Sequence, residues 1–308
     1  MNYVYPKLSE HDLGVVRLGG AGLGNILFPW ARAAVFARDS GCRMIWPTWP
    51  SIKLGPILRR EKDKRFYGDL FESASSDIAG AAKLWKLWRL GRISESEKES
   101  ISLQDETIVE FTGFEGCFEE ILYDYAYVRE QLTERLREKN RRPFSEEVSG
   151  AVGIHVRLGD FARVSEEEVR RGRHDSALPI EWYGKMLEQI RDCAGCEIPA
   201  QVFSDGTDAE LAPLLRLPGV RRKSFGTSIA DIVALSRFPL LIASGSSFSM
   251  WARYLGRGCC ICYPGQRKQR ILTPEEEGFE IETNEVFTAE IAEKIRRLYR
   301  QERQEKSL

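Results

Sequence analysis

Three short segments of the chain, far apart in the sequence, combine residue types that bind phosphate. They are Gly-Ala-Gly-Leu-Gly-Asn at 20–25, Gly-Ile-His-Val-Arg-Leu-Gly-Asp at 153–160 and Ser-Gly-Ser-Ser-Phe-Ser at 244–249. Each follows an apolar run that is typical of a buried strand, namely residues 15–18, 151–154 and 240–243. A strand that runs into a Gly/Ser-rich turn and a helix start points backbone N–H groups and a helix dipole at one place. The three turns, one with an Arg beside it, predict a diphosphate site between two α/β domains.

The segment at 153–160 is the most specific of the three. If residues 153–156 form a strand, His155 and Arg157 lie on the same face, and Arg157 stands at its carboxyl end. A guanidinium there can bind two phosphate oxygens as a fork, and Asp160 can orient it. The alternative is a structural Arg–Asp pair with His155 as a hydrogen-bonded core histidine. The spacing alone does not separate the two.

The other two segments are less specific. Residues 20–25 are similar to a dinucleotide-binding fingerprint, but Phe28 and Pro29 follow where that pattern has its next glycine, so a structural tight turn is the alternative. In the segment 244–249 a single serine would suffice to cap the next helix. Several serines and a glycine exceed what a cap needs, which favours anion binding.

The bulk composition is that of an ordinary globular protein. The chain has 308 residues, 43% of them hydrophobic and 30% charged, with a formal net charge of -1. A neutral balance gives no global basic field, so nucleic acid is not a favoured partner. We find no secretory pattern at the N-terminus and no apolar run of spanning length. The expected location is cytoplasmic, with the inner face of the membrane as an open alternative.

The seven cysteines are expected to be reduced thiols. Cys193 and Cys196 lie in a turn-like segment. Cys259, Cys260 and Cys262 run along a strand-like stretch, where cysteine is more often a small buried hydrophobe. Zinc binding by these groups is the less favoured alternative, because the second group lacks the two-residue gap of a zinc knuckle. We therefore expect no metal site.

Alternating strands and helices predict an α/β fold with parallel, doubly wound sheets. The first half is expected to contain strands at 14–18, 43–46 and 107–111 and helices at 25–38 and 121–139. The second half is expected to contain strands at 151–156, 200–203, 239–243 and 259–263, and helices at 180–192, 207–215, 228–236, 249–255 and 287–308. A basic segment that ends at Pro143 predicts the domain boundary, which gives domains at 1–143 and 144–308.

Residues 81–92 interleave tryptophans with basic residues. On a helix this pattern is compatible with contact with a membrane surface. The favoured interpretation is a helix that buries Leu84, Trp85, Leu87 and Trp88, and leaves Lys83, Lys86 and Arg89 in solvent.

Taken in order, the segments resemble one family, the bacterial and animal α-1,2-fucosyltransferases of glycosyltransferase family 11. The glycine segment with Leu27 and Phe28 behind it, and then the His-X-Arg-X-Gly-Asp segment, carry the resemblance. Leu-Pro-Ile-Glu-Trp-Tyr at 178–183, Val-Phe-Ser-Asp at 202–205 and the stretch 231–250 strengthen it. The resemblance extends from about residue 15 to residue 255 and is weak between 51 and 149.

The resemblance implies a GT-B type glycosyltransferase with two Rossmann-like domains that face each other across a cleft. It also implies inversion of the anomeric centre, no need for a metal, and GDP-fucose as the donor substrate, with no other cofactor. The N-terminal domain would serve the acceptor and the C-terminal domain the nucleotide sugar. The acceptor would be a glycan, free or lipid-linked, of surface polysaccharide or lipopolysaccharide synthesis, and a peripheral membrane contact stays open.

Carried over by position, the resemblance also implies roles for individual residues. Arg157 would contact the donor diphosphate, and Asp205 would lie on the nucleotide side. A second phosphate cradle would come from Ser246, Ser247 and Ser249. The N-terminal loop that closes on the donor would comprise Gly22, Gly24 and Asn25, and His155 completes the expected donor site.

Two departures from the family pattern leave the donor sugar open. The family usually has a second Arg where this chain has Leu158, and a Gln where it has Ile26. Arg163 or Arg253 could supply a compensating cation. A different nucleotide-sugar donor and a non-catalytic binding relative are therefore the alternatives.

The general base is also open. Asp160, His174 and Asp175 are near the right motif, but an aspartate held by Arg157 would be too weak a base. The imidazole of His174 has a suitable intrinsic pKa, which makes it the candidate base.

Overall fold

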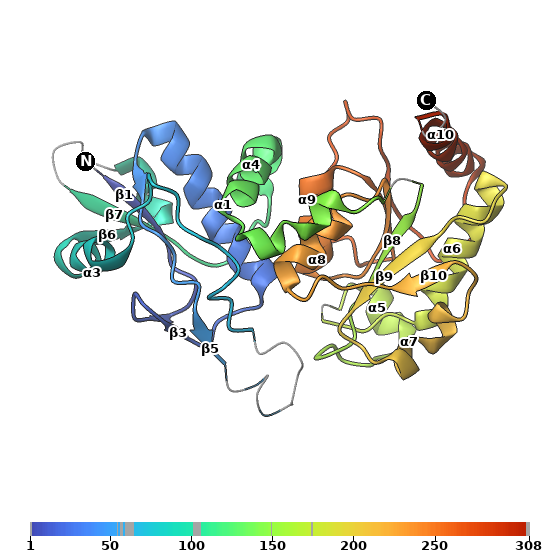
Figure 1. Ribbon diagram of the computed structural model, residues 1–308, viewed down its shortest axis with the longest axis horizontal. Coiled ribbons are helices and arrows are strands. Elements are labelled where there is room, and N and C mark those ends of the chain that lie inside the picture. The colour runs from blue at the N-terminus through green and yellow to red at the C-terminus, as the bar shows by residue number, and fades with distance from the viewer. Residues whose placement is uncertain are drawn as a thin grey trace. The chain divides into compact units, whose positions relative to one another are not determined.

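The structure is a computed structural model that describes residues 2–53, 55, 58, 65–100, 106–148, 150–173 and 175–305. The chain divides into two compact units, Met1–Arg141 and Arg142–Leu308. Each unit contains a parallel sheet with helices packed against it (Figure 1). The predicted α/β class is therefore confirmed.

The first unit is built on a parallel sheet of order β4-β1-β7-β6. Its elements are β1 Tyr3–Pro6, β2 His11–Asp12, β3 Arg17–Leu18, α1 Leu23–Ser40, β4 Arg43–Met44, β5 Ser51–Ile52, α3 Gly80–Arg89, β6 Gly91–Ser94, η1 Glu95–Ser100, β7 Thr107–Phe111, η2 Glu119–Asp124, α4 Tyr125–Arg135 and η3 Glu138–Asn140. The predicted helix at 25–38 and strand at 107–111 are confirmed as α1 and β7. The predicted helix at 121–139 is shorter, since its first residues form the 3₁₀ helix η2.

The predicted buried strand before the glycine turn is wrong. Val15 and Leu18 are exposed, and among the described strands β3 pairs with β2 and β5 alone, in a small separate sheet. Gly14, at φ 81°, turns the chain there, and the inward residue is Arg17, whose Nε donates to the Thr48 carbonyl at 3.1 Å. The sheet's own first strand is β1, which no pattern above predicts.

The second unit is built on a six-stranded sheet of order β10-β9-β8-β11-β12-β13, in which every pairing is parallel. Its elements are η4 Arg142–Ser145, β8 Val152–Val156, α5 Glu166–Arg170, α6 Ile180–Ala194, β9 Ala200–Ser204, α7 Asp208–Leu215, β10 Val220–Arg222, α8 Ser228–Leu235, β11 Leu240–Ala243, α9 Ser247–Gly256, β12 Cys259–Cys262, β13 Glu280–Glu282 and α10 Ala289–Glu305. Counted from β8, this is the Rossmann order 3-2-1-4-5-6.

Both faces of this sheet are covered, because successive side chains of a strand point to opposite faces. Val152, Ile154 and Val156 pack into one core with apolar residues of α6, α7 and α10. Leu241 and Cys260 pack into the other core with residues of α8 and α9. Figure 1 shows α8 and α9 on one side of β8 and β9, and α6 and α7 on the other. The predicted elements of this half are therefore confirmed as a doubly wound sheet, to which the structure adds β10 and β13.

The favoured prediction for the aromatic helix at 81–92 is wrong. In α3, Trp85 is 50% and Trp88 80% exposed, whereas Lys83 is 4% exposed. Leu84 is also exposed, and only Leu87 of the four apolar residues packs against the core beneath the helix. The helix thus turns Lys83 and Lys86 toward the sheet, whereas its tryptophans and Arg89 are exposed.

Candidate functional site

The chain order of the second sheet reverses between β8 and β11. β9 lies on one side of β8, and β11 lies on the other. The loops that leave the carboxyl ends of β8 and β11 therefore diverge, and in open α/β sheets ligands bind in the crevice that opens at such a point. Two of the three segments singled out in the sequence, 153–160 and 244–249, are the segments that contain these strand ends.

Arg157 follows β8 directly and is held between two carboxylates. Its Nη1 lies 2.6 Å from Oδ2 of Asp205, and its Nη2 donates to Oδ1 of Asp160. The guanidinium carbon stands 5.3 Å from the ring centroid of Phe161. The predicted Arg157–Asp160 pair is therefore present, and Asp205 joins it from the end of β9.

Asp205 is fixed by the backbone as well as by Arg157. Its Oδ1 accepts the backbone N–H of Leu158 at 2.9 Å. A Cβ on Gly159 would lie 2.2 Å from Oδ2 of Asp205, so the carboxylate occupies the space that any larger residue at 159 would need. The glycine of the His-X-Arg-X-Gly-Asp segment thus allows Asp205 to reach the guanidinium.

The guanidinium of Arg157 has N–H groups left to bind a further anion at this strand end. A guanidinium has five N–H groups, and the two contacts to Asp160 and Asp205 do not use them all. The side chain of Arg157 is 22% exposed, so solvent reaches it. An anion that bound here would have to compete with two carboxylates for one cation, so it would need further N–H donors beside Arg157.

His155 lies two residues before Arg157, in β8, and is buried. Its Nδ1 is 2.7 Å from Oγ of Ser249 and 2.9 Å from Oγ of Ser244, and its ring stacks on Phe248 at 4.6 Å. Burial, and secondarily the positive charge of Arg157, lower the pKa of His155 to about 3. The imidazole is therefore neutral at physiological pH and acts as a hydrogen-bonding part of the core.

The serine cluster after β11 is tied into the same network. Oγ of Ser244 is 3.1 Å from Oγ of both Ser246 and Ser249. Ser246 is the N-cap of α9 and accepts the backbone N–H of Ser249 at 3.4 Å. These three serines are buried, whereas Ser247 in the first turn of α9 is partly exposed. Ser247 and the N-terminal N–H groups of α9 are thus the donors of this segment nearest to solvent.

The predicted N-terminal loop lies in the first unit, at the start of α1. Gly22 is the N-cap of α1 without a side-chain cap, Gly24 is buried, and the N–H of Asn25 donates to the Gly22 carbonyl at 3.0 Å. The loop thus belongs to the first of the two compact units.

Two buried cations support this loop, and the sequence analysis missed both. Arg17 donates from Nη1 to the Gly19 carbonyl at 3.1 Å, and Lys53 donates from Nζ to the Ala21 carbonyl. Tyr67 accepts the N–H of Leu23 at 3.1 Å. Burial lowers the pKa of Arg17. An Arg inside an otherwise apolar run was the available signal, and nothing in the sequence singled out Lys53.

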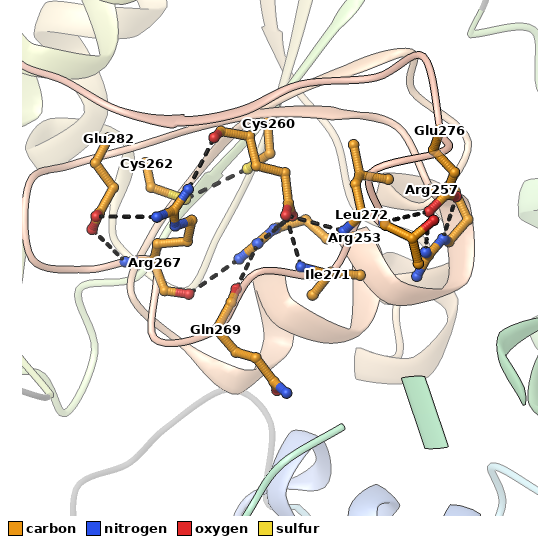
Figure 2. Close-up of polar contacts among 12 residues, drawn as sticks. Arg253, Arg257, Cys260, Cys262, Arg267, Gln269, Ile271, Leu272, Glu276 and Glu282 are labelled. Atoms are coloured by element: carbon orange, nitrogen blue, oxygen red, sulfur yellow. Dashed lines mark hydrogen bonds and ion pairs between the residues drawn. The ribbon is translucent and has the colours of Figure 1, made fainter. Parts of the chain in front are cut away.

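The cations expected to compensate for Leu158 are engaged elsewhere. Arg253 is 2% exposed and forms an ion pair with the equally buried Glu280; its Nη2 also donates to the Gln269 carbonyl at 3.0 Å. Figure 2 shows this network around α9 and the loop before β13, with Arg253 between Arg267 and Leu272. Arg163 is mostly exposed and pairs with Glu210 at 2.7 Å. Arg253 is therefore a structural residue, because its guanidinium closes the loop between β12 and β13.

Three further sequence predictions concern the base and the metal. His174 lies outside the described residues. Its neighbour Asp175 has a left-handed backbone at φ 56°, and its carbonyl accepts the N–H of Ala162 at 2.8 Å. Within the described ranges, no group of three His, Cys, Asp or Glu residues is placed to hold a metal ion. All seven cysteines are free in the structure.

Comparisons with known proteins identify the family and agree with the fold. The model of glycosyl transferase family 11 matches residues 92–282, which include both strand ends described above. No curated protein matches the sequence.

Solved structures with a similar fold have low sequence identity. A mutant of FUT1 from Arabidopsis thaliana, in complex with GDP, is 14% identical at a TM-score of 0.51, over 85% of this chain and 70% of that one. The fucosyltransferase NodZ from Bradyrhizobium is 15% identical at a TM-score of 0.47, over 82% and 91%. POFUT1 in complex with GDP is 11% identical at a TM-score of 0.44, over 83% and 94%. At these identities the likeness concerns the fold.

Proposed function

The chain belongs to glycosyl transferase family 11, and we propose that it transfers fucose from GDP-fucose to a hydroxyl group of a glycan, with inversion and with an α-1,2 linkage. The observation that carries the proposal is the position of Arg157. It stands at the carboxyl end of β8, beside the point where the order of the second sheet reverses, and within the matched residues. That place is where a Rossmann sheet binds the phosphates of a nucleotide.

In the proposed reaction an acceptor hydroxyl attacks the anomeric carbon while the bond to the β-phosphate oxygen breaks. The electron pair of that bond stays on the departing GDP, and the hydroxyl proton passes to a base. Arg157, with the N-terminal N–H groups of α9, would stabilise the charge that develops on the diphosphate. Preorganised donors of this kind are often the largest catalytic contribution.

His155 supports this site and does not accept the proton. It is buried, its Nδ1 is engaged by Ser244 and Ser249, and its pKa is lowered to about 3. Its proposed role is to hold the end of β8 against the first turn of α9, so that Arg157 and Ser247 face the same ligand. Asp160 is held by Arg157 and is therefore the poorer candidate for the base, which leaves His174 as the proposed one.

The donor sugar is the part of the proposal with a specific rival. Leu158 stands where the family usually has a second Arg, and its side chain packs against the apolar core of the second unit. The second candidate is therefore a different nucleotide-sugar donor, one with another sugar or one whose diphosphate is bound less tightly. The acceptor is proposed to be a glycan, free or lipid-linked.

The proposal is tested by combining ligand binding with donor turnover. We expect GDP to raise the melting temperature more than ADP or UDP does, and equally with magnesium or with a chelator. A ligand at about a hundred times its dissociation constant stabilises by about 2.7 kcal/mol. GDP release from GDP-fucose should exceed release from GDP-mannose or UDP-galactose. If the protein bound GDP but released none from any nucleotide sugar, it would be a binding protein and not an enzyme. If GDP binding required magnesium, the proposal of a metal-free diphosphate site would be contradicted.

A further inference from the structure

The orientation of α3 is fixed by its two inward lysines. Nζ of Lys83 donates to Oγ1 of Thr48 at 2.8 Å and lies 5.4 Å from the ring centroid of Tyr5. Nζ of Lys86 donates to the hydroxyl of Tyr3 at 2.6 Å and lies 3.9 Å from its ring centroid. Because Tyr3 and Tyr5 belong to β1, this central strand of the first sheet holds the inner face of the helix.

The opposite face of α3 is apolar and exposed. Leu84, Trp85 and Trp88 of this face are joined by exposed Leu13 and Val15 of the loop between β2 and β3. A Cβ on Gly14 would lie 2.6 Å from Cδ2 of Leu84, so the loop and the helix are in close contact. We call these residues the aromatic surface: Leu13, Val15, Leu84, Trp85 and Trp88.

The charges around the aromatic surface are of both signs, because Asp12 precedes Leu13 in the loop and Lys83 is buried under α3. Residues 80–94 contain four basic residues and no acidic one. Glu106 lies 3.9 Å from Lys86, and Glu110 lies 2.8 Å from Arg92, so these two cations are partly offset. Arg89 stands 5.6 Å from the ring centroid of Trp85, and no ion pair of Arg89 is found in the described part of the chain. The surface thus combines exposed tryptophans with an exposed, uncompensated cation.

We propose that the aromatic surface binds the face of an anionic lipid bilayer. Tryptophan prefers the boundary between headgroups and acyl chains, and basic residues beside it are attracted to anionic headgroups. The contact is peripheral, since no described helix is long and apolar enough to cross a membrane. The inference does not depend on the proposed glycosyl transfer, because its test measures binding alone.

Three occupants could cover the aromatic surface: a bilayer, a second copy of the chain or a soluble glycan. Charge complementarity favours the bilayer. A second copy of the chain would cover the tryptophans, but its own aromatic surface would bring another Arg89 and no counter-charge. A soluble glycan could stack on Trp88, but it would gain nothing from Arg89 unless it were acidic. The anionic bilayer uses both the apolar side chains and the cation.

Sedimentation of the full chain with lipid vesicles tests the proposal. We expect the protein to bind vesicles of phosphatidylcholine with phosphatidylglycerol, and to bind vesicles of phosphatidylcholine alone more weakly. The double variant Trp85→Ser/Trp88→Ser should lower the partition coefficient about tenfold or more. Arg89→Gln should lower it about fivefold on the anionic vesicles only.

The matched control is Tyr123→Ser, which removes another aromatic side chain that is 77% exposed in the first unit. Its partition coefficient should stay unchanged, and all variants should keep the melting temperature because the altered side chains are exposed. Equal vesicle binding by the double variant and the unaltered chain would overturn the proposal. The proposal would also be overturned if the unaltered chain did not bind vesicles and the double variant instead lost self-association or binding to a soluble oligosaccharide.

Discussion

Arg157 and Asp205 face each other across two neighbouring strand ends, with Nη1 of the first 2.6 Å from Oδ2 of the second. The pairing follows from the register of β8 and β9, in which Val156 stands beside Ser204. Each residue is the first after its strand. The pair therefore fixes the direction of the guanidinium at the point where the diphosphate is proposed to bind.

The contact between Gly159 and Asp205 gives the first prediction. In Gly159→Ala the new Cβ would lie 2.2 Å from Oδ2 of Asp205, so the carboxylate must move and release Arg157. We expect donor turnover to fall about tenfold to a hundredfold, as misplaced catalytic groups cause. The control is Gly91→Ala, where no atom lies within 4 Å of the added Cβ. Full turnover in Gly159→Ala, measured as GDP release, would show that the position of Asp205 does not matter.

The second prediction concerns His155 and pH. The pKa of His155 is lowered to about 3 in the folded protein, so between about pH 3 and 6.5 the unfolded chain binds a proton that the folded one does not. The contribution of His155 to the free energy of unfolding is complete above pH 6.5 and decreases as the pH is lowered. We expect the unaltered protein to lose about 1.4 kcal/mol more than His155→Asn between pH 7.5 and 5.5.

Denaturant unfolding of both proteins at the two pH values measures this difference. At pH 7.5 the variant itself should be less stable by about 1–3 kcal/mol, because Ser244 and Ser249 lose a buried partner. Parallel pH profiles for the two proteins would mean that His155 takes up its proton in the folded state.

The third prediction separates a structural Arg253 from one that binds the donor. Arg253 and Glu280 are 2% and 1% exposed, and Oε2 of Glu280 also accepts the N–H groups of Ile271 and Leu272. Glu280→Gln leaves a buried guanidinium without its counter-charge, which costs about 3–5 kcal/mol. The KM for the donor should stay the same in the protein that remains folded.

An exposed pair supplies the control for this experiment. Arg171 and Glu167 are both 74% exposed, so Glu167→Gln should change the free energy of unfolding by less than about 1 kcal/mol. If Glu280→Gln raised the KM for the donor and left stability intact, Arg253 would be part of the donor site after all.

The sequence predicted the second unit better than the first, for a physical reason. Strands buried on both faces, such as β8 and β11, are continuous apolar runs bounded by turns, and helices with a clear apolar period follow them. From the strand order, the ends of β8 and β11 had to be near each other. The pairing of Arg157 with Asp160 could be predicted from their spacing, but its pairing with Asp205 depends on the register of β8 and β9.

The errors fall where tertiary contacts decide which face is buried. In α3, Lys83 and Lys86 recur at the same helical spacing as Trp85 and Trp88, so periodicity identifies two faces without ranking them. The hydroxyls of Tyr3 and Tyr5, with Thr48, make the inner position favourable for ammonium groups. Likewise, the apolar run around Arg17 suggested a buried strand, because the Thr48 carbonyl that accepts from Nε of Arg17 lies 31 residues away in the sequence.

The most direct test of the central claim measures GDP release and melting temperature on the same preparations of Arg157→Lys and Arg157→Ala. Lysine keeps the charge but loses the fork, so Arg157→Lys should lower turnover substantially. Arg157→Ala should lose about 2–4 kcal/mol of transition-state stabilisation, as removal of an oxyanion donor does. Its melting temperature should change little, because the partners Asp160 and Asp205 are about one-third exposed. A stable Arg157→Ala variant that releases GDP at the unaltered rate would contradict the account.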